Sequence, residues 1–316
     1  MKHQILAFAV AALSFTACTN EDNISQDFLA DTPIKLNVSV DEPTTRAGYS
    51  DADKPTGFVL EVVNHNADKY NYLVWAKKVG DSWKTYKPDE TLKGGTDEEV
   101  TMLWANMNDK VDVTAFTNIG TITIPTDQTG DEQLKEADVL YMPSSQIAPR
   151  KEGIKVALQH AMSKINLTIE LGSEFEFTED INKKITDVKI DGSSVSGDLA
   201  SGGIYDVSGD PTPITPLYTG ETAFSKEAGK ITKAKATYEA ILIPQDIASG
   251  KFTVSFKVEG KLYEWVYNNE AGLTLAPNTA YTLKLIAGDD KVQPASFSVA
   301  KWNPGNGENG ENKETD

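Results

Sequence analysis

Residues 165–171 read Ile-Asn-Leu-Thr-Ile-Glu-Leu, so that apolar and polar side chains alternate strictly. Successive side chains of a β-strand point to opposite faces, and this alternation therefore predicts a strand with one buried face and one wet face. Helical periodicity is scarce in the chain, whereas Gly- and Pro-containing breaks are frequent between such runs. The sequence predicts an all-β protein. Similar alternating runs occupy residues 34–40, 111–116, 252–258 and 281–285.

Chain length predicts two β-sandwiches in series. One sandwich of about seven strands takes about 100 residues, and roughly 285 residues of this chain carry strand patterns. We place the boundary near Gly172, which gives an N-terminal sandwich over 47–172 and a C-terminal sandwich over 173–302. The apolar run that begins at Ile154 and continues to Leu171 is predicted to be one long or bent strand that closes the first sandwich.

Composition excludes several classes of function. The 316 residues contain 30 Lys and Arg against 47 Asp and Glu, a net charge of −17 that phosphate groups would repel. We therefore expect no nucleic-acid partner. A single cysteine and three histidines predict no disulfide framework, no metal site and no cofactor. No common hydrolase or NTPase motif occurs, so the chain is predicted not to be an enzyme.

The N-terminus has the pattern of an export signal. The apolar stretch 5–13 is much shorter than the about 20 residues that a membrane-spanning helix needs. It ends in Phe15-Thr16-Ala17-Cys18, which resembles a bacterial lipobox with Phe15 in place of the usual leucine. Residues 1–17 are thus predicted to be a lipoprotein signal peptide, with lipid attached to Cys18. At the other end, the acidic segment 303–316 lacks large apolar side chains and is predicted to be disordered.

Six short motifs, taken in order, resemble those of the fimbrillin family, the subunits of the type V pili of Bacteroidales. Together they span nearly the whole chain. Asn278 stands where the family usually has glycine, and asparagine is the residue after glycine that best tolerates a positive φ. The motifs are Thr44–Gly48, Thr114–Asn118, Ala137–Tyr141, His160–Ile165, Tyr238–Gln245 and Leu275–Leu283.

This resemblance implies two tandem transthyretin-like Greek-key β-sandwich domains and export as a lipoprotein to the outer membrane and cell surface. It also implies that an arginine-specific protease cuts between Arg46 and Ala47, so that residues 18–46 form a propeptide. The processed subunit would then join other pilus subunits by donor-strand exchange. A fimbrium built in this way would contribute to adhesion through a receptor on a host or bacterial surface.

The residues before Arg46 suit a removable first strand. Ile34, Leu36, Val38 and Val40 alternate with polar residues, so an edge strand here would bury four aliphatic side chains. At about 1.5–3 kcal/mol each, they would contribute roughly 6–12 kcal/mol before chain entropy is subtracted. Loss of this strand would expose a groove and unpaired backbone groups that another subunit's strand could fill.

The candidate donor strand lies near the C-terminus. Ala295, Phe297 and Val299 alternate with polar or small residues, as a strand that fills a groove requires. The alternative is that this strand completes the second sandwich of its own chain. The only arginine besides Arg46 is Arg150, and a cut there would split the first sandwich.

A second function remains open from sequence: a surface glycan-binding lipoprotein that keeps its lipid anchor. Trp75, Trp83 and Trp104 could stack on sugars if they were exposed, although their spacing in strands favours burial in the core. His160 ends an alternating run and is predicted to be a core histidine bonded to the backbone, because no nucleophile motif accompanies it.

Overall fold

The computed structural model describes residues 30–40, 48–50, 52–172, 174–175, 184–199, 205–227, 230–288 and 291–302. Cys18, the Arg46–Ala47 bond and the acidic segment 303–316 lie outside the described residues. Strands dominate the rest, and the prediction of an all-β protein is confirmed. The helices of the described part are one α-helix, α1 (Asp131–Ala137), and a 3-10 helix at Asp68–Tyr70.

Eight strands form the first sheet. It is antiparallel except at one edge, where its first strand in sequence pairs in parallel with its last. In spatial order the strands are β1 (Leu36–Val40), β9 (Ile154–His160), β8 (Leu140–Ile147), β6 (Val111–Phe116), β2 (Gly57–Val63), β3 (Tyr72–Val79), β4 (Ser82–Pro88) and β5 (Gly95–Glu99).

The remaining strands form four smaller sheets. The largest has five strands in the order β14 (Leu217–Glu227), β15 (Lys230–Leu242), β10 (Ser163–Leu171), β20 (Thr279–Ala287) and β21 (Val292–Lys301). Two sheets have three strands each: β11 (Ile185–Asp191), β17 (Thr253–Val258) and β18 (Lys261–Val266), and β13 (Tyr205–Pro211), β12 (Ser194–Leu199) and β7 (Gly120–Thr123). The last pairs β16 (Gln245–Ile247) with β19 (Leu273–Leu275).

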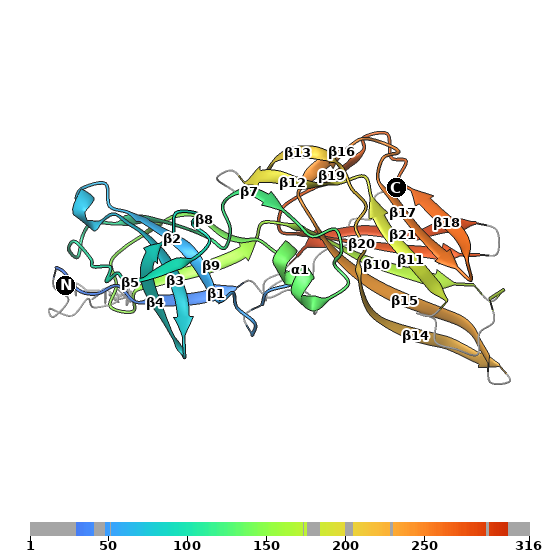
Figure 1. Cartoon of the computed structure of the whole chain (residues 1–316), viewed down its shortest axis with the longest axis horizontal. Helices are drawn as coiled ribbons and strands as arrows, with labels where there is room; N and C mark the ends of the chain where they lie inside the picture. Colours follow the sequence, from blue (N-terminus) through green and yellow to red (C-terminus); the bar gives the residue numbers. More distant parts are fainter. Residues whose placement is uncertain are drawn as a thin grey trace, which may run out of the picture.

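The molecule is elongated, with the eight-stranded sheet at one end and the smaller sheets at the other (Figure 1). Its buried apolar side chains fall into two clusters that follow this division. The first cluster, around Phe58 and Trp104, packs under the eight-stranded sheet. The second, around Leu167 and Phe256, lies among the smaller sheets. Each cluster supplies its own end of the molecule with a hydrophobic core.

The stretch 165–171 forms most of β10, as its alternation predicts. Ile165, Leu167, Ile169 and Leu171 are at most 1 % exposed and belong to the second cluster. Asn278 adopts the positive φ that asparagine tolerates in place of glycine, since this residue has φ 51°. The prediction of strand type and buried face is confirmed here.

The prediction of one continuous strand from Ile154 to Leu171 is wrong. Strand β9 ends at His160 and pairs with β1 and β8, whereas β10 begins at Ser163 and pairs with β15 and β20. The buried residues have even numbers in β9 and odd numbers in most of β10. Such a change of phase requires a break in the strand, because a strand alternates strictly.

The chain therefore crosses from the first cluster to the second before Gly172. Ala161 and Met162 are both fully buried in the second cluster, and Ile122 and Leu134 also belong to it. The expected division into 47–172 and 173–302 is thus not the division between the two clusters. Segments 120–139 and 161–171 precede Gly172 in sequence but pack at the other end of the molecule.

Candidate functional site

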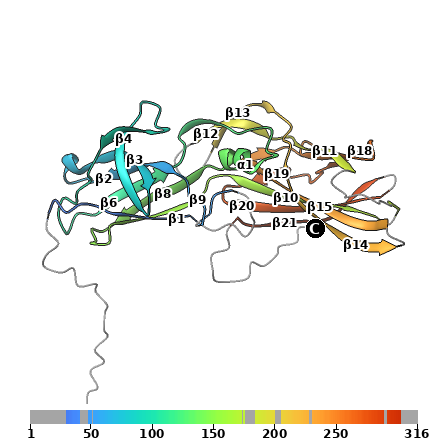
Figure 2. The same cartoon turned by 60° about the horizontal axis from the view of Figure 1, so that its bottom comes forward.

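Strand β1 is one edge of the eight-stranded sheet, and within the part of the chain that the structure describes β9 is the strand that pairs with it (Figure 2). The two strands run in parallel, with Leu36 opposite Ile154 and Val40 opposite Leu158. A strand held along one edge loses one row of backbone hydrogen bonds when it leaves, whereas a central strand would lose two. This position is the one that the predicted removable strand requires.

Burial of the four predicted aliphatic side chains is graded. Val38 and Val40 are buried at 8 % and 3 % exposure, while Ile34 and Leu36 are half-buried against the same cluster. Ile34 lies before β1, and its N–H donates to the carbonyl of Met102 at 2.8 Å. The prediction that all four side chains are buried is therefore confirmed at Val38 and Val40 and met only in part at Ile34 and Leu36.

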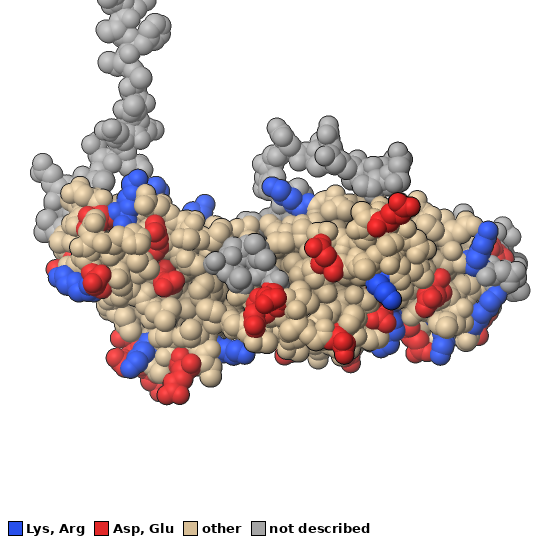
Figure 3. All heavy atoms as spheres, turned by 90° about the horizontal axis from the view of Figure 1, so that it is seen from above, with Lys and Arg blue, Asp and Glu red and all other residues tan. Residues whose placement is uncertain are grey.

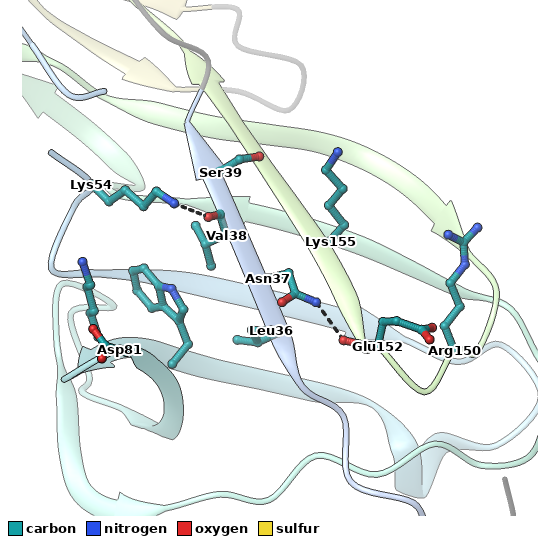
Figure 4. Close-up of a pocket in the computed structure, with 12 residues that line it drawn as sticks. Leu36, Asn37, Val38, Ser39, Lys54, Asp81, Arg150, Glu152 and Lys155 are labelled. Atoms are coloured by element: carbon teal, nitrogen blue, oxygen red, sulfur yellow. Dashed lines mark hydrogen bonds between the residues drawn. The ribbon is translucent and has the colours of Figure 1, made fainter. Parts of the chain in front are cut away.

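A groove of about 750 Å³ runs along β1 (Figure 4). Lys54 Nζ donates a hydrogen bond to the carbonyl of Val38 at 2.7 Å, and Asn37 Nδ2 donates to the carbonyl of Glu152 at 2.7 Å. Lys54 thus bonds to a backbone carbonyl of β1, while Asn37 ties β1 to the residue that precedes Gly153 and β9. Other charged residues that line the groove are Lys78, Asp81, Arg150 and Lys155.

The candidate donor strand is β21, the outer strand of the five-stranded sheet. It pairs antiparallel with β20 and so lies in a sheet of its own chain. Phe297 is half-buried and packs against Tyr267 and Tyr281, with ring centroids 5.2 and 6.1 Å away. Ala295 and Val299 are exposed, Val299 by 37 %. The strand is thus held by backbone pairing and by the half-buried side chains of Val292 and Phe297, which pack against the second cluster.

The end of β21 meets the first half of the chain at a buried cluster of three side chains. Asp138, His160 and Trp302 are at most 3 % exposed. His160 Nδ1 lies 2.8 Å from Asp138 Oδ1, and the imidazole stacks on the Trp302 indole with centroids 4.2 Å apart and planes 3° apart. We call these residues the junction cluster. His160 is a core histidine as predicted, but its partner is a carboxylate and not the backbone.

The start of the segment after Arg46 also reaches the junction cluster. Tyr49 donates its backbone N–H to Asp138 Oδ2 at 2.8 Å, and its half-buried ring packs against the first core. Burial raises the pKa of the Tyr49 phenol, and the charge of Asp138 adds to this rise. Tyr49 and His160, which are far apart in sequence, therefore both bond to Asp138. The motif Ala137–Tyr141 contains Asp138, but nothing in that motif indicates this role.

A buried ion pair flanks the junction cluster. Lys164 Nζ lies 2.9 Å from Glu239 Oε2 and 5.7 Å from the centroid of the Trp302 ring. Burial lowers the pKa of the Lys164 ammonium, and the Glu239 carboxylate offsets only part of this effect. Lys164 occurs in the motif His160–Ile165, but nothing in that motif indicates that its charge is buried.

Replacing Gly48 with alanine is expected to destabilise the protein by about 2–4 kcal/mol. Gly48 has φ 96°, and a Cβ there would lie 2.6 Å from Asp138 Oδ2. Gly80→Ala is the matched control, because Gly80 also has a positive φ but no atom within 4 Å of its Cβ position. We expect it to cost only about 1 kcal/mol. Urea unfolding measures both, and equal losses would contradict a crowded contact at Gly48.

Other kinds of site find little support in the described ranges. No group of three His, Cys, Asp or Glu side chains there could hold a metal ion, and no helix there is long and apolar enough to cross a membrane. Acidic and basic side chains are scattered over the face shown in Figure 3. Trp104 is buried at 1 % exposure, and Trp75 and Trp83 are half-buried.

Comparison with known proteins identifies the family. A family model described as fimbrillin-like matches residues 45–302, from the residue before Arg46 to Trp302. No curated protein matches the chain.

Solved structures share the fold at low sequence identity. A candidate cell adhesion protein from Bacteroides uniformis has 15 % identity and a TM-score of 0.54, over 86 % of this chain and 98 % of that chain. A second from Bacteroides ovatus has 17 % identity and a TM-score of 0.53, over 85 % and 97 %. The tip fimbrial protein Mfa3 from Porphyromonas gingivalis, with a C-terminal truncation, has 10 % identity and a TM-score of 0.50, over 86 % and 100 %.

The family match covers far more than half of the chain, and the fold agrees with it. The chain belongs to the fimbrillin-like family, whose members are structural proteins of cell-surface fimbriae and not enzymes.

Proposed function

We propose that this protein is a subunit of a type V pilus that is exported as a lipoprotein and assembled by donor-strand exchange. In this proposal Cys18 carries the lipid that anchors the precursor in the outer membrane. An arginine-specific protease cuts between Arg46 and Ala47 and frees the subunit from this anchor. The observation that carries the proposal is the place of β1, an edge strand that ends shortly before Arg46 and that pairs, among the described strands, with β9.

Removal of β1 would create an apolar acceptor groove. The three residues of β9 that face the core, Ile154, Val156 and Leu158, are fully buried in the present state. Loss of β1 would uncover part of this surface and leave one row of backbone N–H and C=O groups of β9 unpaired. An extended segment from another subunit would restore both the apolar contacts and the hydrogen bonds.

Strand β21 has the spacing that such a groove accepts. Ala295, Phe297 and Val299 repeat the two-residue spacing of Leu36, Val38 and Val40. As an outer strand with exposed side chains, β21 can leave its sheet at a smaller cost in buried area than a central strand would. The partners in this proposal are other pilus subunits, and a surface receptor would be bound by the finished fimbrium.

The burial of the aromatic side chains favours this proposal over a glycan-binding lipoprotein. In the described part of the chain the large exposed apolar side chains are Leu73, Val79, Leu262 and Val299, and none of them is aromatic. Trp75 is covered by two glycines, since a Cβ on Gly57 or Gly95 would lie 2.5 or 2.7 Å from its ring. A stacking platform for sugars needs exposed aromatic faces.

Mass spectrometry of the N-terminus tests the proposal on protein from intact cells. We expect the wild-type chain to begin at Ala47 and to form high-mass ladders on gels of unboiled samples. Arg46→Lys should leave the N-terminus at a lipidated Cys18 and abolish the ladders, since it removes the arginine that the protease recognises. Arg150→Lys is the matched control and should be processed normally. Wild-type protein that always begins at lipidated Cys18 would contradict the proposal and favour the glycan-binding lipoprotein.

A further inference from the structure

The candidate donor strand and the removable segment share a short sequence pattern. Residues 33–39 read Pro-Ile-Lys-Leu-Asn-Val-Ser, and residues 294–300 read Pro-Ala-Ser-Phe-Ser-Val-Ala. When the two prolines are aligned, each apolar side chain of the first stretch falls on an apolar side chain of the second. Alternation alone would fit several registers, but the prolines select one of them. The aligned pairs are Ile34 with Ala295, Leu36 with Phe297, and Val38 with Val299.

The place of Pro33 in the fold requires no backbone N–H. Pro33 lies opposite Leu103 in an antiparallel bridge. The hydrogen bonds on either side of it are made by Thr32, whose carbonyl accepts at 3.0 Å, and by Ile34, whose N–H donates at 2.8 Å. Proline has no N–H, and its ring fixes φ at about −65°. A second proline can therefore take this place without the loss of a hydrogen bond.

Pro294 does not fit the position two residues before Pro33. Asp31 has φ 62°, which the proline ring forbids, and its N–H donates to a main-chain carbonyl at 2.9 Å. A shift of an incoming strand by two residues in this direction would strain the backbone and lose that hydrogen bond. A shift by a single residue would turn Ser296 and Ser298 towards the core.

The size of the side chains opposes a shift by two residues in the other direction. Such a shift would put Phe297 in place of the buried Val38 and overfill its site. It would also put Ala295 in place of Leu36 and leave a gap there. With the prolines aligned, a valine replaces Val38, and Phe297 replaces Leu36. Leu36 is half-buried and lines the groove beside Trp83, where a larger ring has room (Figure 4).

In its own sheet, β21 leaves most of this pattern unused. Ala295 and Val299 are exposed there, and Phe297 is half-buried. The pairing with β20 also shifts its register between Pro294 and Ser296. The positions that the three apolar side chains would take in the groove all pack against the first cluster. The pattern therefore buries more apolar surface in the groove than in the strand's own sheet.

We propose that an incoming β21 replaces residues 33–39 with its residues 294–300, with Pro294 in the place of Pro33. The incoming strand then runs parallel to β9, as β1 does. This inference rests on the proposed strand exchange and adds its register and direction.

A backbone contact at this edge suits the exchange because it does not depend on the side chain of the strand. Lys54 Nζ donates to the carbonyl of Val38 at 2.7 Å, and in the proposed register the carbonyl of Val299 takes this bond. The match ends before the last residue of β1, where Lys301 would fall on the buried Val40. We therefore expect the incoming strand to leave the groove before Lys301.

Disulfide cross-links to β9 report the register of the incoming strand. Asn37 lies opposite Lys155, and Ser39 lies opposite Ala157. Lys155 and Ala157 are exposed, so cysteines at these positions leave the core packing intact. In the proposed register Ser298 lies opposite Lys155, whereas a shift by two residues towards the end of β1 puts it opposite Ala157. A disulfide joins Cα atoms at most about 7 Å apart, so it separates these two registers.

The experiment uses subunits on intact cells. Cys18 is the only native cysteine and precedes Ala47, so a processed chain contains only the cysteines that are introduced. One variant carries Ser298→Cys with Lys155→Cys, and the matched control carries Ser298→Cys with Ala157→Cys. After mild oxidation, non-reducing gels of boiled samples distinguish covalent ladders from ladders held by strand exchange alone. We expect the first variant to give about ten times more covalent ladder than the control.

A covalent ladder that forms mainly in the control would overturn the inference, because the strand would then lie two residues further along the groove. Ladders in unboiled samples of both variants, with a covalent ladder in neither, would overturn it as well. Both results leave strand exchange itself intact. A wild-type chain that forms no ladders would instead contradict strand exchange, and the inference would fall with it.

A second pair of cysteines serves if the first variant forms no ladders although the wild type does. The proposed register puts Ala300 opposite Ala157, because Ala300 takes the place of Ser39. Ala300→Cys with Ala157→Cys should therefore give a covalent ladder. Ladders of this variant that all disappear on boiling would overturn the inference.

Discussion

Val38→Asp is expected to release the residues before Ala47 as soon as the bond after Arg46 is cut. Val38 is 8 % exposed and packs in the first core, so the substitution places an unpaired carboxylate against apolar side chains. Such a charge costs several kcal/mol. Among the described residues β9 is the strand that pairs with β1, and the other contacts of the fragment are a few hydrogen bonds, between residues 31–34 and 102–104 and from Lys54 to Val38. Size-exclusion chromatography of the Arg150→Lys chain, nicked at Arg46 by an arginine-specific protease, measures whether the fragment stays bound.

Ser39→Asp is the control for this experiment. Ser39 is the next residue of β1, lies half-buried on the groove and points to the other face of the strand. The same charge there meets solvent and the lysines that line the groove, so the fragment should co-elute with the body of the protein, as it should in the parent. A Val38→Asp fragment that stays bound would contradict this prediction and show that the hydrogen bonds of β1 and of residues 31–34 hold it without the apolar contact of Val38.

The sequence predicted the parts of the fold that depend on local pattern. Alternation at 34–40 and 165–171 identified two strands and the faces that they bury. The residue type at Asn278 was compatible with the positive φ that the structure shows there. The sequence also contains the break between β9 and β10, since the buried apolar positions change from even to odd numbers between Leu158 and Ile165. A strict count of phase would have separated β9 from β10.

Contacts between distant segments could not be predicted from pattern. The parallel pairing of β1 with β9 joins residues that lie more than 100 positions apart, as in Leu36 opposite Ile154. Asp138 and His160 occur in two different family motifs, but no local signal shows that their side chains meet. Lys164 is a charged residue in an alternating stretch, where a solvent-facing side chain is the ordinary expectation. Its burial depends on Glu239, which is supplied by another strand.

Trp302→Ala is expected to lower the free energy of unfolding by about 3–5 kcal/mol and to loosen the end of β21. The indole is 1 % exposed and stacks on His160, so its removal leaves a cavity in the junction cluster. Urea unfolding gives the loss of stability. Amide hydrogen exchange of residues 297–301, compared with that of β10, shows whether the loss is concentrated at the end of β21.

Trp302→Phe and Trp83→Ala separate the stacking contact from the loss of a large side chain. Phenylalanine at position 302 keeps an aromatic ring on His160. It breaks no hydrogen bond, because the Trp302 indole nitrogen has no hydrogen-bond partner in the described structure. We expect it to cost about 1–2 kcal/mol and to leave exchange in β21 nearly unchanged. Trp83 is half-buried at the other end of the molecule, so its loss should not affect β21. If Trp302→Ala leaves exchange at residues 297–301 unaltered, β21 is fixed by its pairing with β20 alone, and the junction cluster plays no part in retaining it.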